Sequence, residues 1–226
     1  MNIVSRWQYS LGWRSSLAEV SRGIKYVGLA AGISFASSVF AGPAEQAKRI
    51  HDRLTGAPPS EASLATMTGM IEADGNGVRA AKFAIDNDEN HDFYNVTLKN
   101  WAAPWTNRDS DVFVDLNDYI ATAIGFVRDD KDFRELLYAN VLYVADPSLG
   151  LPAYSISNNS HYAQLEDGIE RNGENGFSLK DDLVEGVQSD LQSLPVAAAA
   201  GVVTSRAASK SFFIAGTNRA NFRFTL

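Results

Sequence analysis

The feature that most constrains the fold is a continuous apolar stripe at helical spacing within residues 92–146. Apolar residues recur there at i, i+3, i+4, i+7, i+8 and i+11, which is one face of an α-helix. A second stripe begins after the polar stretch 128–132, whose Asp residues are suited to capping a helix. We expect two helices packed through these stripes, which comprise Leu116, Tyr119, Ile120, Ala123, Ile124 and Val127, and then Phe133, Leu136, Leu137, Asn140 and Val141.

The remaining sequence also favours helices, joined by short turns and interrupted by one long irregular stretch. Gly56, Pro104 and Pro195 stand where helices are expected to end. Residues 147–175 are rich in Gly, Pro, Ser and Asn, which favours an irregular excursion. Further helices are expected over 43–56, 60–73, 78–85, 92–103 and 178–194, with an extended segment over 141–146, a buried segment over 197–203 and a new element at Thr217.

These patterns predict a mainly α fold. The apolar fraction of 45% is ordinary for a globular protein and provides enough side chains for a substantial core. We expect residues 42–226 to form a single, irregular and orthogonally packed multi-helix domain around one core. The Gly/Pro/Asn-rich segment 147–175 is the irregular part of this domain and the place for any sub-boundary.

The composition argues against several classes of function. A net charge of -7 disfavours binding to nucleic acid and to an anionic membrane surface, because both require clustered Lys and Arg. The chain contains no Cys, which excludes disulfides, thiolate zinc sites, iron–sulfur clusters and covalent haem attachment through C-x-x-C-H. The three His residues are far apart in the sequence and lack metal-ligand spacing. We therefore expect no cofactor.

The first 41 residues have the organisation of a signal peptide. Arg6, Arg14, Arg22 and Lys25 make a basic front, and an uncharged run of 17 residues, YVGLAAGISFASSVFAG, follows it. The sequence Val-Phe-Ala before Gly42 fits a small-residue cleavage site. A membrane anchor is the alternative, but the run is short and is interrupted by Gly and Ser. We expect cleavage, a periplasmic or secreted mature protein, and no stable membrane insertion.

His161 is the candidate for acid–base catalysis. It lies in the irregular stretch near Glu166 and Asp167, and a His beside a carboxylate can act as a general base. No nucleophile motif such as G-x-S-x-G accompanies it. A solvated or hydrogen-bonded His is the more frequent case, so these three residues define a hydrolase only as an alternative.

The acidic turn DNDENHD suggests a calcium loop. Asp86, Asp88, Asn90 and Asp92 occupy positions 1, 3, 5 and 7 of such a loop. Position 6 is His91 instead of Gly, and position 12 is Thr instead of Glu, so the features that shape and close the loop are missing. A solvated turn that caps the next helix is the simpler interpretation, and we predict no metal site.

Aromatic residues before and after Pro104 suggest a binding surface. Tyr94, Trp101 and Trp105 are close in the sequence, and Arg108 follows them. Their rings would stack on a small molecule or a glycan if they lined a groove. Aromatic residues at helical spacing more often belong to a core, which is the competing interpretation.

Several segments resemble a known group of proteins. HDRLTGAPPS, FYNVTLKNWAAPWTNRD, LNDYIATAIGFVRDDKDFRELLYANVLYVAD and GVVTSRAASKSFFIAGTNRANFRFTL are similar to parts of large exported bacterial proteins of unknown function, in which helical domains accompany cytochrome c modules (planctomycete-type cytochrome-associated families). In those proteins the chain continues beyond the last segment to a C-x-x-C-H site. This sequence ends first and has no Cys, so the resemblance transfers no haem-binding residue to it.

The resemblance implies an exported module near redox proteins. We therefore expect a non-catalytic helical module of a cytochrome-associated family, either a fragment or a docking subunit without its own haem. Its expected partner is an exported c-type cytochrome or another periplasmic protein. The alternatives are a periplasmic hydrolase that uses His161 with Glu166 or Asp167, and a small-molecule or glycan binder that uses Trp101 and Trp105.

Overall fold

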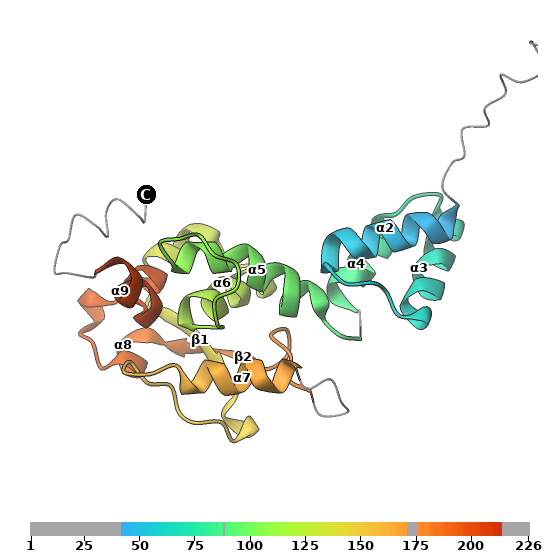
Figure 1. Cartoon of the computed structure of the whole chain (residues 1–226). Helices are drawn as coiled ribbons and strands as arrows, with labels where there is room; N and C mark the ends of the chain where they lie inside the picture. Colours follow the sequence, from blue (N-terminus) through green and yellow to red (C-terminus); the bar gives the residue numbers. More distant parts are fainter. Residues whose placement is uncertain (1–41, 88, 171–175, 214–226) are drawn as a thin grey trace, which may run out of the picture. The chain divides into compact units, whose positions relative to one another are not determined.

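The computed structural model describes residues 42–87, 89–170 and 176–213, and it confirms the predicted mainly helical fold (Figure 1). The predicted signal peptide over 1–41, the candidate ligand Asp88 and the element predicted at Thr217 lie outside the described residues. The extent of the domain and its boundaries stay predictions.

The first three helices of the described residues pack against one another, as expected from their apolar faces (Figure 1). Helix α2 spans Pro43–Thr55, α3 spans Glu61–Asp74 and α4 spans Val78–Asp86. Gly56 and Gly75 end α2 and α3 in the left-handed conformation, with φ of 73° and 66°. The Oγ atom of Ser60 caps α3 by accepting the Ser63 N–H. The buried residues of this cluster are Ala47, Met67, Ile71, Ala80 and Ala84.

A larger apolar cluster surrounds helix α6, Asp118–Arg128, the first of the two helices predicted from the stripes. The side chain of Asn117 caps it by accepting the N–H groups of Tyr119 and Ile120. Every residue from Asp118 to Phe126 is buried, so neighbouring elements cover this helix on all sides. The described part of the chain therefore contains two clusters of buried residues, where we expected one core.

The helix predicted over 92–103 is present but irregular. It begins as a π-helix, η1, over Phe93–Leu98, continues as α5 over Lys99–Ala102, and ends as a 3₁₀ turn, η2, over Ala103–Thr106. As predicted, the α-helical part ends just before Pro104, at Ala102. Pro104 lies in the first turn of η2, where a residue needs no donor N–H, so the backbone continues helically past it.

The second stripe does not form the predicted helix. Only the 3₁₀ turn η3, Phe133–Leu137, forms, and strand β1, Val141–Ala145, follows. The strand agrees with the extended segment expected over 141–146. Val141, Tyr143 and Val144 favour an extended backbone, and a distant strand is available to pair with them. Phe133 and Leu137 are consequently exposed.

The prediction of a helix over 178–194 is also wrong. Residues Leu183–Val187 form strand β2, which pairs antiparallel with β1 so that Ala145 lies opposite Leu183, and only the short helix α8, Gln188–Gln192, follows. The Ser178 N–H donates to Asp182 Oδ2 at 2.7 Å, which fixes a turn before the strand. Pairing with β1 overrides the helical pattern, since the hydrogen bonds of a strand depend on its partner.

Helices α7, Ser160–Glu170, and α9, Arg206–Phe212, were not predicted. The first lies inside the predicted irregular stretch, which also contains the 3₁₀ turn η4, Pro147–Leu149. The segment expected to be buried over 197–203 is only partly so, because Ala197 is exposed whereas Val202 is buried. It overlaps the 3₁₀ turns η5, Val196–Ala198, and η6, Gly201–Thr204.

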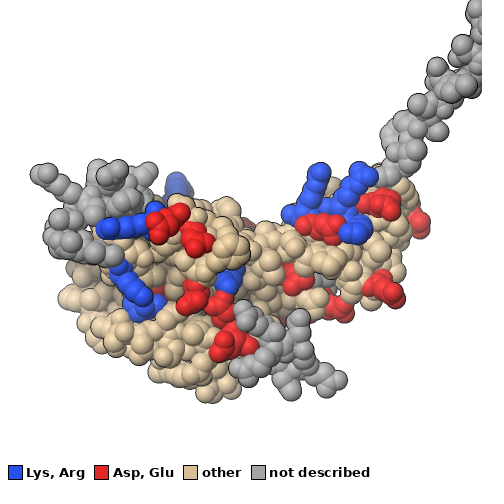
Figure 2. All heavy atoms as spheres, viewed as in Figure 1, with Lys and Arg blue, Asp and Glu red and all other residues tan. Residues whose placement is uncertain are grey.

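Within the described ranges, no helix combines the length and the apolar character that a membrane crossing requires. On the face shown in Figure 2, basic and acidic side chains lie next to one another over the described surface.

Candidate functional site

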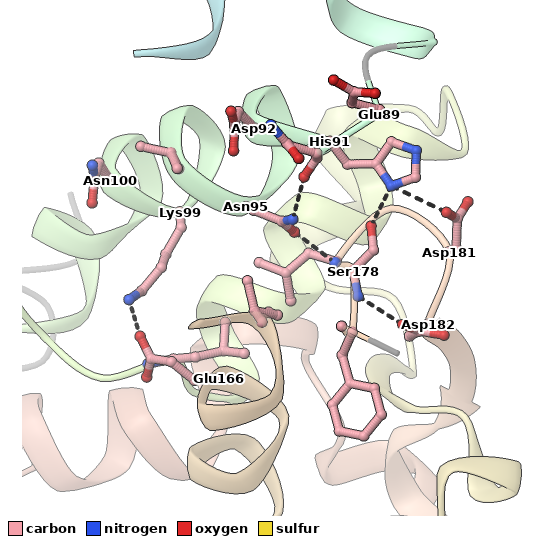
Figure 3. A pocket seen from close by; sticks show the side chains of 17 residues that line it. Glu89, His91, Asp92, Asn95, Lys99, Asn100, Glu166, Ser178, Asp181 and Asp182 are labelled. Carbon is pink, nitrogen blue, oxygen red and sulfur yellow. Dashed lines mark hydrogen bonds and ion pairs between the residues drawn. The ribbon is translucent and has the colours of Figure 1, made fainter. Parts of the chain in front are cut away.

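One cavity, with a volume of about 770 Å³, is lined mainly by polar side chains (Figure 3). It lies where the turn before η1, helix α7 and the turn before β2 approach one another. Carboxylates, amides and one lysine line it, together with a His and a Ser, namely Glu89, Asn90, His91, Asp92, Asn95, Lys99, Asn100, Glu166, Ser178, Asp181 and Asp182.

Much of this polar cavity is used to hold two turns together. The Nδ1 atom of His91 lies 2.8 Å from Ser178 Oγ and 3.2 Å from a carboxylate oxygen of Asp181. The Leu179 N–H donates to Asn95 Oδ1 at 2.8 Å (Figure 3). The turn before η1 is therefore bonded to the turn before β2, two segments that are far apart in the sequence.

His91, Ser178 and Asp181 do not form a catalytic triad. A triad places the serine and the carboxylate on opposite ring nitrogens, so that one nitrogen takes the proton while the other is oriented. Here both groups contact Nδ1. The hydroxyl of Ser178 also accepts the Lys180 N–H at 3.1 Å, as a turn-capping serine does.

The charged pair in this cavity is structural as well. The Lys99 ammonium donates to Glu166 Oε1, and Glu166 Oε2 accepts the Leu116 N–H at 2.8 Å. Both side chains are largely buried. Glu166 thus links α5, α7 and the residue that precedes the α6 cap, and both of its oxygens have partners.

The residues considered for calcium are not arranged around an ion. Asp86 ends α4, Asn90 and Asp92 line the polar cavity, and Asp88 is not described. Among the described residues, no three His, Cys, Asp or Glu side chains are grouped for metal binding. His91 nevertheless has a φ of 52°, the left-handed conformation that the Gly of a calcium loop adopts.

His161 lies in α7, and its side chain is buried. Its Nε2 atom accepts the Ala145 N–H at 2.9 Å, and its Nδ1 atom lies 2.6 Å from the carbonyl oxygen of Pro152. Since Nε2 accepts, the proton of the neutral ring is on Nδ1 and is donated to Pro152. Both nitrogens are bonded to backbone groups and neither to Glu166 or Asp167. The three residues proposed for catalysis therefore share a helix but no hydrogen bond that the structure shows.

An ionised network lies beside the sheet. The Arg128 guanidinium and the Tyr143 hydroxyl both donate to the carboxylate of Asp129. These hydrogen bonds, foremost those from Arg128, hold the pKa of Asp129 below its ordinary value. Arg128 also donates to the Leu183 carbonyl oxygen at 2.6 Å. The network joins α6 to both strands, so these charged groups hold the helix and the sheet together.

Three aromatic rings form a cluster at the surface. The rings of Trp101 in α5 and Trp105 in η2 have centroids 4.3 Å apart at an interplanar angle of 64°. The ring centroid of Phe133 lies 6.0 Å from that of Trp101 and 6.3 Å from that of Trp105. Trp101 is 46% exposed and Phe133 is 41% exposed, whereas Trp105 is partly buried. Such exposure of packed aromatic rings is typical of a binding surface.

A cavity of about 430 Å³ lies beside these rings. Trp105, Phe133 and Tyr119 line it, and burial raises the pKa of the Tyr119 hydroxyl. Arg108 also lines it, and its Nε donates to the Ser211 carbonyl oxygen at 2.9 Å. We call this cavity together with Trp101, Trp105 and Phe133 the aromatic site. The remaining large apolar residues that line the cavity are Pro104, Leu136, Leu137 and Phe212.

The structure brings three of the four predicted binding residues to this site. Trp101, Trp105 and Arg108 lie there, but Tyr94 is buried in the core cluster around α6. Sequence reasoning missed Phe133 and Leu137, which it assigned to the buried face of a helix. The Asp132 side chain, which accepts the Arg134 N–H and so caps a short turn, is the local signal that this segment is a 3₁₀ turn.

Comparison of the chain with protein-family models, with curated proteins and with solved structures found no match.

Proposed function

We propose that this chain is an exported, non-catalytic helical module that binds a small molecule with an apolar ring at the aromatic site. One observation carries the proposal: Trp101, Trp105 and Phe133 pack as a partly exposed cluster beside a cavity of about 430 Å³. A cavity of this size falls within the range typical of small-molecule sites, which is on the order of 300–1,000 Å³.

The composition of the aromatic site supports a ligand with a flat apolar part and an anionic group. Aromatic and aliphatic side chains make up most of the wall, which favours a ring that stacks or packs edge-on. The guanidinium of Arg108 in the lining of the cavity favours a negative charge on the ligand. The wall thus has the combination of apolar surface and a few polar groups that small-molecule sites use.

The bonding of the polar candidates supports a role without catalysis. His161 has both ring nitrogens bonded to backbone groups, so it has no lone pair with which to take a proton from a substrate. The two oxygens of Glu166 are bonded to Lys99 and to the Leu116 N–H. These side chains stabilise α7 and its neighbours.

Docking of a partner protein is the second candidate function. The exposed surface of the aromatic site includes Leu137, which is 52% exposed, and continues to Tyr138, which is 63% exposed. Trp, Tyr and Arg are the side chains that dominate the binding energy of protein interfaces. The resemblance to cytochrome-associated proteins leads us to propose an exported c-type cytochrome, or another periplasmic protein, as the partner.

The primary proposal is tested by titrating the full chain with 1-anilinonaphthalene-8-sulfonate (ANS), which combines an apolar ring system with a sulfonate. We expect the ANS fluorescence to rise to saturation. The affinity for ANS should fall about tenfold in Trp101→Ala and in Phe133→Ala, which is a loss of ~1.4 kcal/mol of binding free energy. Phe113→Ala is the matched control, because Phe113 is a 91% exposed aromatic residue outside this site. Equal weakening in the control, or none in either variant, would contradict the proposal.

Docking and export are tested separately. A purified exported c-type cytochrome is titrated into the full chain in a calorimeter, and we expect heat that disappears in a Leu137→Ala, Tyr138→Ala double variant. Absence of heat with the unaltered chain rejects the docking candidate and leaves the small-molecule proposal standing.

For export, we expect the protein recovered outside the cytoplasm to have the mass of residues 42–226. Recovery of the uncleaved chain from the cytoplasm rejects the proposal of export.

A further inference from the structure

A second cavity, of about 670 Å³, lies beside α8 and α9 and has a different character from the aromatic site. One part of its wall is apolar and is formed by Ile156, Leu194 and Ala198. The other part carries Gln192 from α8 and Arg206 from α9. Each of these two side chains has one buried polar atom with no hydrogen-bond partner among the described residues.

The orientation of the Gln192 amide is determined by its neighbours. The hydroxyl of Tyr154 donates to Asp118 Oδ2 at 3.0 Å, so it can only accept from Gln192. The Nε2 atom of Gln192 donates to that hydroxyl at 2.9 Å. Its Oε1 atom is therefore an acceptor with no partner, on a residue whose relative exposure is only 5%. A buried polar atom without a partner is costly and needs an explanation.

Arg206 supplies the complementary group. Its guanidinium donates through one terminal nitrogen to Asn159, but its Nε–H is buried and has no acceptor. Lys210 follows Arg206 by one turn of α9 and lines the same cavity, which adds a second positive charge. The residues that line this cavity thus include a cation with an unpaired buried donor, a neutral amide with an unpaired buried acceptor, and three apolar side chains.

The carboxylate bonded to these elements already has partners of its own. Asp118 accepts the N–H groups of Arg206 and Ala207 at 2.6 and 3.0 Å, and it also accepts the Tyr154 hydroxyl. Asp118 does not line the cavity, and neither does any other Asp or Glu of the described residues. The charge offered to a ligand is therefore that of the two cations.

We propose that this cavity binds a small carboxylic acid that also carries an amide N–H and an apolar group. The carboxylate pairs with the guanidinium of Arg206 and is attracted by Lys210. The amide N–H donates to Gln192 Oε1, and the apolar group packs on Ile156, Leu194 and Ala198. This site is separate from the aromatic site, with which it shares no lining residue.

The probe is N-acetyl-L-leucine, which has all three groups, and the reference compound is N-acetyl-L-leucinamide, which lacks the carboxylate. Both are titrated into the full ¹⁵N-labelled chain and followed by NMR. With N-acetyl-L-leucine we expect saturable shifts at the Gln192 side-chain amide and at the Arg206 Nε–H. N-acetyl-L-leucinamide should bind at least about tenfold more weakly, because it lacks the carboxylate that makes the charge-assisted hydrogen bond. No saturation with the acid, or equal affinities, would overturn the proposal.

Three variants complete the test. Gln192→Glu is expected to abolish binding, because the new carboxylate repels the ligand and pairs with Arg206. Lys210→Ala, at an exposed position where folding should be unaffected, is expected to weaken binding severalfold. Lys82→Ala removes an exposed helical lysine of α4 and is expected to leave binding unchanged. Equal affinities of the two lysine variants would overturn the proposal even if Gln192→Glu failed to fold.

Discussion

The Nε2 atom of His161 accepts the backbone N–H of Ala145 at 2.9 Å, which joins helix α7 to strand β1. The other ring nitrogen bonds the carbonyl oxygen of Pro152 at 2.6 Å. One buried imidazole therefore satisfies two backbone groups, one from the strand and one from the irregular segment that follows it. The residue that the sequence favours most for catalysis has a structural function here.

Replacing this ring is expected to cost stability. His161→Phe keeps most of the volume but leaves the Ala145 N–H and the Pro152 carbonyl without partners. The Ala145 N–H is buried, whereas Pro152 is exposed and its carbonyl can bind water instead. One unpaired buried group costs about 1–3 kcal/mol, so the free energy of unfolding should fall by about that amount. Urea denaturation followed by circular dichroism measures it. An unchanged unfolding midpoint would show that these bonds contribute nothing and that the ring is available for other roles.

The contact between α6 and β1 leaves no room for a side chain at Gly125. A Cβ atom at this position would lie 2.3 Å from the ring of Tyr143, whose hydroxyl is bonded to Asp129. Gly125→Ala is therefore expected to destabilise the protein by about 1–3 kcal/mol. Gly69→Ala in α3 is the matched control, because a Cβ there meets nothing within 4 Å, and it should stabilise by about 0.5–1 kcal/mol. The same sign for both variants in chemical denaturation would contradict this packing.

Stability should fall at alkaline pH because of buried tyrosines. Burial raises the pKa of the Tyr162 hydroxyl, which donates to the Tyr143 carbonyl oxygen at 2.7 Å, well above its ordinary value. Below pH ~10 both folded and unfolded chains keep this proton; above it only the unfolded chain releases it, so stability decreases as the pH rises.

The contribution of Tyr162 is about 1.4 kcal/mol per pH unit above pH ~10. In Tyr162→Phe the free energy of unfolding should be lower at pH 8, since a hydrogen bond is lost, and the difference from the unaltered protein should shrink between about pH 10 and pH 11. Urea denaturation of both proteins across this pH range measures the difference. Parallel pH profiles of the two proteins would show that this hydroxyl titrates alike in both states.

Local signals were sufficient for α2, α3, α4 and α6. In these helices an apolar face coincides with a start or stop signal, such as the left-handed Gly56 or the Asn117 cap, so the sequence and the fold agree. The mainly α class followed from them. The two wrong helices, over 133–141 and 178–194, overlap the strands β1 and β2. Each strand requires the other as its partner, with Val141 opposite Val187, and no local pattern contains that pairing.

The candidate site could be predicted only in part, for the same reason. Trp101, Trp105 and Arg108 are close in the sequence, so their proximity in space follows from one irregular helix. Phe133 reaches them from a different segment, and its place depends on how that segment forms a 3₁₀ turn. The cavity lined by Gln192 and Arg206 combines α8 and α9, neither of which was predicted in its observed form.

The most direct test of the central proposal is an NMR titration of the full ¹⁵N-labelled chain with ANS, in which the indole N–H signals of Trp101 and Trp105 are assigned with Trp101→Phe and Trp105→Phe. Binding at the aromatic site predicts saturable shifts of both indole signals and of the Phe133 amide, at one common dissociation constant. Saturable shifts elsewhere with these three signals unmoved would contradict it.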